Sequence, residues 1–240
     1  MIGPLLDRTD AQIQAIRDRT PFAFSRWGDG EWSCILGRRI DPARNACGMP
    51  YSAPLRKDLT AILTSEASYA LGLCDSVIHG RSAYHKTMAK DVAAWIEAHA
   101  RVRWVFGDGI ENLSVTGQLR TLTEALATRT VIMVGPDYLR DDLRLFPMAG
   151  HVSVPDLNMR HEDHVDRLVD QAGTLLSQWP AAVVTISAGM TANILADRLF
   201  RAFPLASFLD CGSVWEPYAG RSNRNYHDGI LARERKRATV

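Results

Sequence analysis

The chain alternates between short apolar runs and longer segments in which apolar residues recur every three or four positions. The short runs predict buried strands, whereas the spacing of three and four predicts amphipathic helices. The predicted strands cover residues 22–24, 69–74, 102–106, 131–134, 151–154, 182–186 and 207–209. The predicted helices cover residues 7–19, 32–36, 54–63, 85–100, 119–127, 163–179 and 191–200. Strands and helices therefore alternate along nearly the whole sequence.

This alternation predicts the fold class. Strands that are separated by helices of about ten or more residues pair in parallel through right-handed crossovers. The expected architecture is an α/β fold with a doubly wound, mostly parallel sheet and Rossmann-like helix layers on both faces. No internal repeat or low-complexity linker interrupts the chain, so we expect a single domain over residues 1–240.

Composition narrows the class of protein only slightly. Apolar residues make up 46% and charged residues 23%, and the net charge of +1 gives no overall attraction to nucleic acid or membranes. No signal peptide and no apolar stretch of about 18 residues is visible, so we expect no membrane span and a cytoplasmic location. The four cysteines, at positions 34, 47, 74 and 211, form no C-x-x-C pair, which fits reduced thiols.

The most informative short segment is Arg26-Trp27-Gly28-Asp29-Gly30-Glu31, between a predicted strand and a predicted helix. Its two glycines allow positive φ and close approach of a ligand. Alternate residues of an extended turn point the same way, so Asp29 and Glu31 can offer both carboxylates to one hard cation, which in turn holds phosphate oxygens. The end of a strand is also where ligands bind in open α/β sheets. The plain alternative is an acidic surface turn.

A second strand-to-helix turn covers residues 187–192. Free backbone N–H groups and the helix dipole suit a phosphate there, although the glycine at 189 equally fits a tight connection. The turn is neither a G-x-G-x-x-G nor a Walker sequence, which argues against dinucleotide oxidoreductases and P-loop enzymes. His161 and His164 resemble a metal pair, but their place at a predicted helix start favours a solvated helix end.

The C-terminal end, residues 220–240, is basic and holds little that can pack. Its cations are Arg221, Arg224, Arg233, Arg235, Lys236 and Arg237. This composition predicts a flexible end or, alternatively, an arm that contacts the phosphates of a polyanionic acceptor, with Tyr218, Tyr226 and His227 as stacking groups.

Together these features resemble the GT-D fold glycosyltransferases, a bacterial family of metal-dependent sugar transferases. The family has an arginine–aromatic–Gly-Asp-Gly-Glu segment after its first strand, and residues 26–31 match it throughout. Weaker matches follow in the family's order at residues 131–135, 155–158, 187–195 and 210–212. The chain departs from the pattern at Ser213, where the family commonly has a histidine, and across residues 215–220.

The resemblance implies transfer of a sugar, expected to be a hexose, from a nucleoside diphosphate donor such as a UDP-sugar, with Mn²⁺ or Mg²⁺. Asp29 and Glu31 would hold the metal and take part in catalysis. The implied donor-binding residues are Arg26, Gly28, Gly30, Asn158, Ser187, Gly189 and Thr191, with Arg26 either touching phosphate or bracing the acidic turn. An inverting transfer also needs a base, for which the candidates are Asp156, Asp210, Glu216 and His227. If the family's histidine holds metal or donor, that role is missing here or has moved, with His227 as a candidate.

Two other interpretations stay open. The first changes the acceptor from a glycan to a hydroxymethylated DNA base, as in virus-encoded base modification, and would place the protein in a host cytoplasm. The second is a nucleotide-binding module without catalysis, in which Asp29 and Glu31 merely order a turn. The identity of the sugar, the acceptor, the stereochemical outcome and the oligomeric state do not follow from these patterns.

Overall fold

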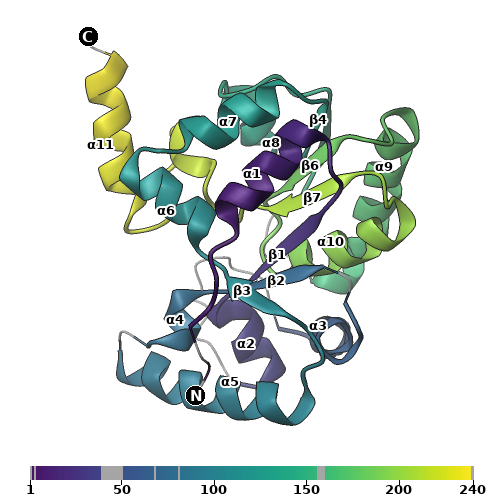
Figure 1. The fold of residues 1–240 in the computed structure, drawn as a ribbon, viewed down its shortest axis with the longest axis vertical. Coiled ribbons are helices and arrows are strands. Elements are labelled where there is room, and N and C mark those ends of the chain that lie inside the picture. The colour runs from purple at the N-terminus through teal and green to yellow at the C-terminus, as the bar shows by residue number, and fades with distance from the viewer. Residues whose placement is uncertain are drawn as a thin grey trace.

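The computed structural model describes residues 2, 4–38, 51–67, 69–80, 82–155 and 160–238 (Figure 1). Within these residues seven strands form one sheet in the order β3-β2-β1-β7-β6-β4-β5, and every neighbouring pair is parallel. The strands are β1 (Ala23–Trp27), β2 (Ala70–Leu73), β3 (Trp104–Phe106), β4 (Val131–Gly135), β5 (Gly150–Ser153), β6 (Val183–Ile186) and β7 (Ser207–Asp210). The expected doubly wound α/β fold is confirmed, with a sheet that is wholly parallel.

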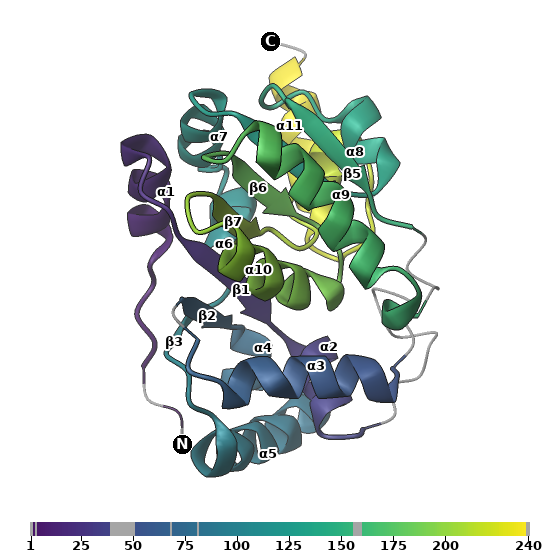
Figure 2. The ribbon, with the colours of Figure 1, turned by 90° about the vertical axis from the view of Figure 1, so that its right-hand side faces the viewer.

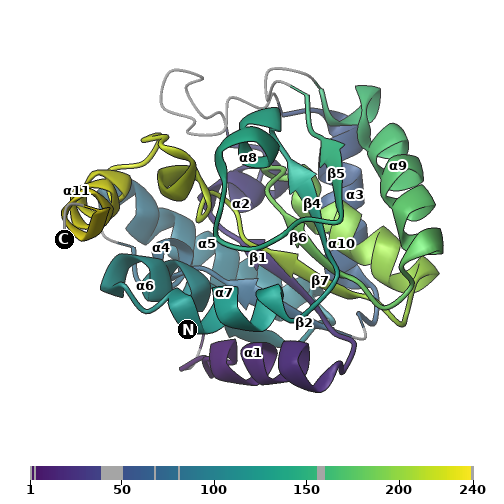
Figure 3. The ribbon, with the colours of Figure 1, turned by 90° about the horizontal axis from the view of Figure 1, so that it is seen from above.

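Helices cover both faces of this sheet. One layer contains α2 (Asp29–Ile35), α3 (Ala53–Thr64), α5 (Ala83–His99), α9 (Val165–Gln178) and α10 (Thr191–Ala202) (Figure 2). The other contains α1 (Thr9–Asp18), α6 (Gly109–Thr116), α7 (Arg120–Ala127) and α8 (Asp137–Asp142) (Figure 3). Neighbouring strand residues serve opposite layers: Val184 packs in the first core cluster and Val183 in the second. Both faces are therefore buried, which explains why the central strands read as continuous apolar runs.

The strands end nearly level with one another at their carboxyl edge. Trp27 is paired with Leu73, while Ile186 is paired with both Val134 and Asp210. The segments that follow β1, β4, β6 and β7 therefore leave the sheet side by side. In an open parallel sheet this is the edge at which ligands bind.

Short helices account for most of the differences from the sequence-based expectation. The structure adds α4 (Asp75–Ile78), α6, α8 and the 3₁₀ turns η1 (His161–Asp163) and η2 (Glu216–Ala219), none of which was expected. Helices of one or two turns carry too few periodic positions to be recognised from an apolar stripe. Strand β1 is also longer than expected, because it continues through Arg26 and Trp27.

The C-terminal end forms helix α11 (His227–Ala238) instead of an irregular basic end. Ile230 and His227 are buried. Arg233 donates from Nη2 to the carbonyl of Ser114 at 2.6 Å and from Nη1 to that of Val115 at 2.8 Å, at the last turn of α6. Figure 1 shows α11 lying against α6 and projecting from the body. These partners lie more than a hundred positions away in the sequence, so local composition did not indicate them.

In the part of the chain that the structure describes, no helix is both long and apolar enough to cross a membrane.

Candidate active site

The acidic turn is the first turn of a helix rather than an extended loop. Helix α2 begins at Asp29, and Glu31 Oε2 accepts a hydrogen bond of 2.9 Å from the Gly28 amide, which is the half of a capping box that a glycine N-cap allows. The expectation that both carboxylates point the same way was wrong, because helical residues two apart diverge. The Asp29 side chain is 57% exposed, whereas Glu31 turns inward. Neither Gly28 nor Gly30 uses the positive φ that glycine allows.

The turn at residues 187–191, which follows β6, lies against this acidic turn. Asn193 Nδ2, in the first turn of α10, lies 3.4 Å from Glu31 Oε1. A Cβ atom on Gly30 would lie 3.7 Å from the Met190 side chain. Asn193 was not a candidate in the sequence analysis, although its position three residues into a helix after a glycine turn was a usable signal. The structure thus brings the two predicted ligand-binding turns into contact.

Asp210, at the end of β7, is buried beside β1. Its Oδ2 accepts from the Arg26 amide at 2.9 Å and its Oδ1 from the Gly212 amide at 3.0 Å. Burial raises its pKa, against the opposing effects of Arg26 and these two amides. Burial is also the main reason that the pKa of Glu31 rises to about 7, and the charges of Asp210 and Asp29 act in the same direction. Three carboxyl groups therefore share a region of unfavourable negative potential.

Arg26 braces the site from inside the protein. Its Nη2 donates to Asp108 Oδ1 and to Glu111 Oε2, both at 2.8 Å, and its Nε donates to the Gly107 carbonyl at 3.2 Å. Burial raises the pKa of Asp108, but the Arg26 charge and hydrogen bond outweigh it and hold that pKa below its usual value. Of the two roles considered for Arg26, this geometry favours bracing over phosphate contact.

Two buried oxygen atoms near the α10 N-terminus have no hydrogen-bond partner among the described residues: Ser187 Oγ and Asn193 Oδ1. Buried polar atoms are normally paired, so an unpaired one commonly indicates a missing water, ion or ligand. Gly189, between them, has a φ of 54°. The glycine is therefore required by the left-handed backbone itself, which supports the tight-connection interpretation without excluding a ligand.

His161 and His164 are buried, not solvated as the sequence analysis expected. His161 Nδ1 lies 3.2 Å from Thr191 Oγ1, and its Nε2 lies 3.2 Å from Asp58 Oδ2. Asp58 in turn accepts from Arg198 at 3.0 Å. Burial lowers the pKa of His161, against the effect of Asp58. This network connects α3, η1 and α10, and it orients Thr191, one of the predicted donor-binding residues.

Glu216, at the start of η2, and His227, at the start of α11, lie together in the part of the chain that follows β7. His227 Nδ1 accepts from the Asn223 amide at 3.2 Å and lies 3.7 Å from Glu216 Oε2, which has no hydrogen-bond partner among the described residues. Burial lowers the pKa of His227 to about 4 and raises that of Glu216. His227 is completely buried, whereas the Glu216 side chain is 17% exposed. Only Glu216 of this pair can meet a ligand at the surface.

Ser213, which stands where the resembled family has a histidine, is within 2.8 Å of the Tyr226 hydroxyl. Tyr226 and His227 stack edge to face with ring centroids 4.5 Å apart. The aromatic residues at the C-terminal end therefore pack against the protein. Arg221 likewise lies over the Tyr138 ring and Arg233 caps α6, which removes two of the six cations from the predicted acceptor-binding arm.

His85 was not a candidate in the sequence analysis, yet it faces the acidic turn from α5. Its Nε2 lies 3.9 Å from Asp29 Oδ2. Its Nδ1 lies 2.8 Å from Ser82 Oγ, the cap of the same helix. A single histidine in a predicted amphipathic helix carries no distinguishing signal, so only the tertiary structure identifies it.

Among the described residues, no group of three or more His, Cys, Asp or Glu side chains is arranged to hold a metal ion. Asp29 is exposed and accessible, while Glu31 already gives one oxygen to the Gly28 amide. Ions such as Mg²⁺ in nucleotide sites usually take one or two protein carboxylates and complete their shell with phosphates and water. The residues present therefore fit an ion that binds together with a diphosphate.

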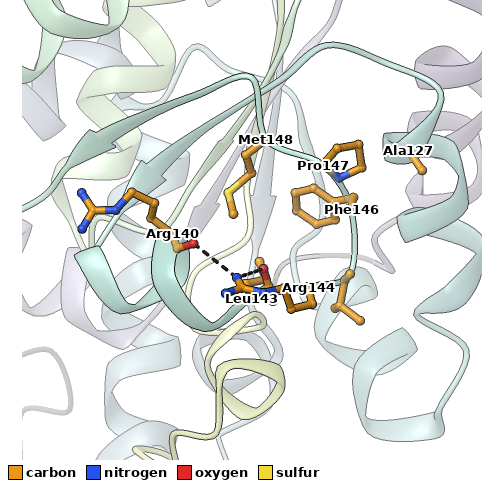
Figure 4. Close-up of a pocket in the computed structure, with 8 residues that line it drawn as sticks. Ala127, Arg140, Leu143, Arg144, Phe146, Pro147 and Met148 are labelled. Atoms are coloured by element: carbon orange, nitrogen blue, oxygen red, sulfur yellow. Dashed lines mark hydrogen bonds between the residues drawn. The ribbon is translucent and has the colours of Figure 1, made fainter.

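Two predicted site residues, Asp156 and Asn158, lie outside the described residues. A separate cavity of about 520 Å³ lies at the segment between α8 and β5 (Figure 4). Arg144 Nη1 donates to the carbonyls of Arg140 and Leu143 at 3.5 and 3.1 Å, whereas the Arg140 side chain is 52% exposed and pairs with Asp137 and Asp141. None of the predicted site residues lines this cavity, and we do not assign it to the active site.

Comparisons with known proteins find solved structures with a similar fold. No family model matches the chain, and no curated protein sequence matches it. Among solved structures, one described as a new glycosyltransferase with domain of unknown function 1792, from Streptococcus sanguinis, is 15% identical, with a TM-score of 0.66 over 90% of this chain and 84% of that chain.

Two further structures of domain of unknown function 1792 are similar. The selenomethionine form is 16% identical with a TM-score of 0.64, and the other, described as having a distinct glycosyltransferase fold, is 15% identical with a TM-score of 0.54. Each covers 86% of this chain and 77% of its own. The chain is therefore an α/β protein whose fold is similar to that of structurally characterised glycosyltransferases.

Proposed function

We propose that the protein is a metal-dependent glycosyltransferase that transfers a sugar from a nucleoside diphosphate donor, a UDP-sugar, to an acceptor hydroxyl. The observation that carries this proposal is the contact between the first turns of α2 and α10, through Glu31 and Asn193, at the carboxyl edge of the sheet. That contact puts an acidic turn beside a helix N-terminus, in a fold whose neighbours are described as glycosyltransferases. A cation and an anion would find suitable partners on adjacent turns.

The donor diphosphate is assigned to the N-terminus of α10. This helix is twelve residues long, and its amide dipoles favour an anion at that end. Ser187 Oγ is buried there without a partner among the described residues, and a hydroxyl can donate to a phosphate oxygen. His161 fixes the orientation of Thr191 at the same end. These groups are already ordered, so binding the donor costs little rearrangement.

Asp29 is the residue that would hold the cation directly, with Glu31 acting directly or through water. A bound divalent cation would stabilise the negative charge that develops on the departing diphosphate. Asn193 keeps Glu31 in place, and Arg26 with Asp210 keeps the strand from which the turn leaves in register. The protein thereby holds the Asp29 carboxylate in place for the ion without reorganisation at the moment of reaction.

Glu216 is the best candidate for the acceptor base among the described residues. Asp210 is a weaker candidate because both of its oxygens accept hydrogen bonds from backbone amides, and His227 is weaker because it is completely buried. The Glu216 side chain is partly exposed, although its Oε2, unpartnered in the described part of the chain, is buried against His227, and burial raises its pKa, which makes this carboxylate a stronger base. The acceptor hydroxyl would therefore approach between η2 and the donor.

The direct experiment is a panel of nucleotide sugars incubated with the protein and Mn²⁺ or Mg²⁺, scored for release of nucleoside diphosphate. We expect release from one UDP-sugar, stopped by chelator and by Asp29→Asn. The variant Asp137→Asn changes an exposed acid after β4 and serves as the control. No release from any donor by a folded protein would refute the proposal and favour the non-catalytic module.

A further inference from the structure

His85 lies beside Asp29 of the acidic turn and has no role in the function proposed above. It belongs to α5, which packs against α2, and its side chain is partly exposed toward Asp29. The two groups are 3.9 Å apart between Nε2 and Oδ2, which is too long for a hydrogen bond. The pair therefore leaves Nε2 with unused bonding capacity beside an accessible carboxylate.

Ser82 determines how the imidazole can act. Its Oγ accepts the His85 backbone amide at 3.2 Å and lies 2.8 Å from His85 Nδ1. When Nδ1–H donates to this oxygen, the lone pair of Nε2 faces Asp29. Histidines that bind metals almost always have this arrangement, in which the second ring nitrogen donates to a neighbouring group.

The separation between Asp29 and His85 suits a shared ion. Distances from a divalent ion to a carboxylate oxygen or an imidazole nitrogen are about 2.0–2.2 Å, so one ion can touch both atoms across 3.9 Å. On the Glu31 side of the same turn, Asn193 is completely buried, donates from Nδ2 to Glu31 and has an Oδ1 without a partner among the described residues. His85 and Asp29 thus offer one nitrogen and one accessible carboxylate oxygen to a single ion.

We infer that His85 is a nitrogen ligand of the catalytic cation, which it shares with Asp29 once a donor diphosphate is bound. The inference rests on the proposed function, because the diphosphate and water complete the coordination shell. Mg²⁺ is bound through oxygen, whereas transition metals accept imidazole. His85 therefore makes the site select Mn²⁺ over Mg²⁺, and Ser82 is its positioning residue.

The test measures metal binding rather than turnover. Mn²⁺ is titrated into the full chain with saturating UDP, with free Mn²⁺ followed by electron paramagnetic resonance and bound Mn²⁺ examined by pulsed methods for coupling to imidazole nitrogen. We expect this coupling in the wild type and its loss in His85→Gln. Loss of a metal ligand should weaken Mn²⁺ binding about tenfold or more. Binding of Mg²⁺, measured by competition, should stay nearly unchanged.

Two further variants keep the test decisive. His79 forms a similar pair with Asp75 at 3.7 Å but is 73% exposed, so His79→Gln is a matched control that should leave the coupling intact. Ser82→Ala keeps the imidazole but removes its partner, and it should weaken Mn²⁺ binding while the nitrogen coupling persists. If His85→Gln fails to fold, weaker Mn²⁺ binding by Ser82→Ala than by His79→Gln becomes the supporting result, and equal binding by the two overturns the inference.

The outcomes separate this inference from the proposed function. Normal binding of Mn²⁺ with UDP but no nitrogen coupling, or a coupling that survives His85→Gln, overturns the assignment of His85 and leaves the proposed function standing. Failure of the folded wild type to bind Mn²⁺ with UDP at all counts against both. Coupling that is lost in His85→Gln and retained in His79→Gln supports the inference.

Discussion

The side-chain amide of Asn193 lies 3.4 Å from Glu31 Oε1, which joins helices whose contacting residues are 162 positions apart in the chain. Asn193 is completely buried, so this amide is committed to Glu31 and cannot exchange it for water. The contact couples the acidic turn after β1 to the helix N-terminus after β6. A substitution in one turn is therefore expected to alter the structure or stability of the other.

Replacing this amide tests the coupling. Asn193→Asp is nearly isosteric but puts a second carboxylate against Glu31, whereas Asn193→Ala only removes the donor. We expect both to lower the free energy of unfolding by about 1–3 kcal/mol, because a buried partner is removed. Above pH 7, the loss in free energy of unfolding should be larger for Asn193→Asp than for Asn193→Ala. Near pH 5 the two losses should become similar, because protonation removes the repulsion between the carboxylates. Urea unfolding at both pH values is the measurement, and equal losses at high pH would contradict the assigned contact.

Substitutions of Asp29 and Glu31 are expected to affect stability and activity differently. Asp29 is exposed, so Asp29→Asn should leave stability within about 0.5 kcal/mol of the wild type while removing most activity. Glu31→Gln should reduce activity and also disturb the cap on Gly28. Losses of about a hundredfold are expected, since cation stabilisation is worth several kcal/mol. Steady-state release of nucleoside diphosphate checks this, and activity in chelator equal to that in Mn²⁺ would rule out the metal assignment.

The raised pKa of Glu31 predicts a pH-dependent stability. Its pKa is about 7 in the folded protein and near 4.5 when unfolded, so the folded state binds more protons between these values. The stability contributed by protonated Glu31 is fully present below about pH 4.5 and is lost as pH rises through 7. The full effect is up to about 3 kcal/mol. In metal-free buffer, the wild type should lose stability relative to Glu31→Gln between pH 5 and 8, and parallel curves would contradict this.

Gly189 can be tested without backbone strain. Its φ of 54° makes valine unsuitable, because a fold defect would mimic a binding defect. Asparagine tolerates left-handed backbone, so Gly189→Asn should fold and place a side chain at the α10 N-terminus. We expect weaker UDP binding by calorimetry, with a melting temperature close to that of the wild type. Unchanged affinity in this folded variant would leave Gly189 as a turn residue only.

The basic end offers two separable changes. Arg233→Met removes the two hydrogen bonds to the Ser114 and Val115 carbonyls and should lower stability by about 1–2 kcal/mol. Truncation after Glu234 keeps Arg233 and removes Arg235, Lys236 and Arg237. If the acceptor is DNA, removing each cation that neutralises a phosphate should flatten the log–log salt dependence of binding by about one unit. An unchanged slope with intact donor hydrolysis would count against a DNA acceptor.

The alternation of apolar strands and amphipathic helices was sufficient to predict the doubly wound sheet. A central strand such as Val131–Gly135 is buried on both faces and so reads as a continuous apolar run. The position of Asp29 and Glu31 at the end of the first strand was also readable, because chain order places that turn at the carboxyl edge. These features depend on residues that are neighbours in sequence.

The partners within the site were decided only by the tertiary structure. Arg26 binds Asp108 and Glu111 instead of facing a ligand, Glu31 meets Asn193, and Asp29 faces His85. The contact of α11 with α6 through Arg233 is another pairing that only the tertiary structure decided. Each pairing joins residues more than fifty positions apart, and its geometry depends on strand order, helix length and side-chain rotamer together. Local propensity and spacing carry no information about such distances, because only the packed core brings these charges close enough to interact.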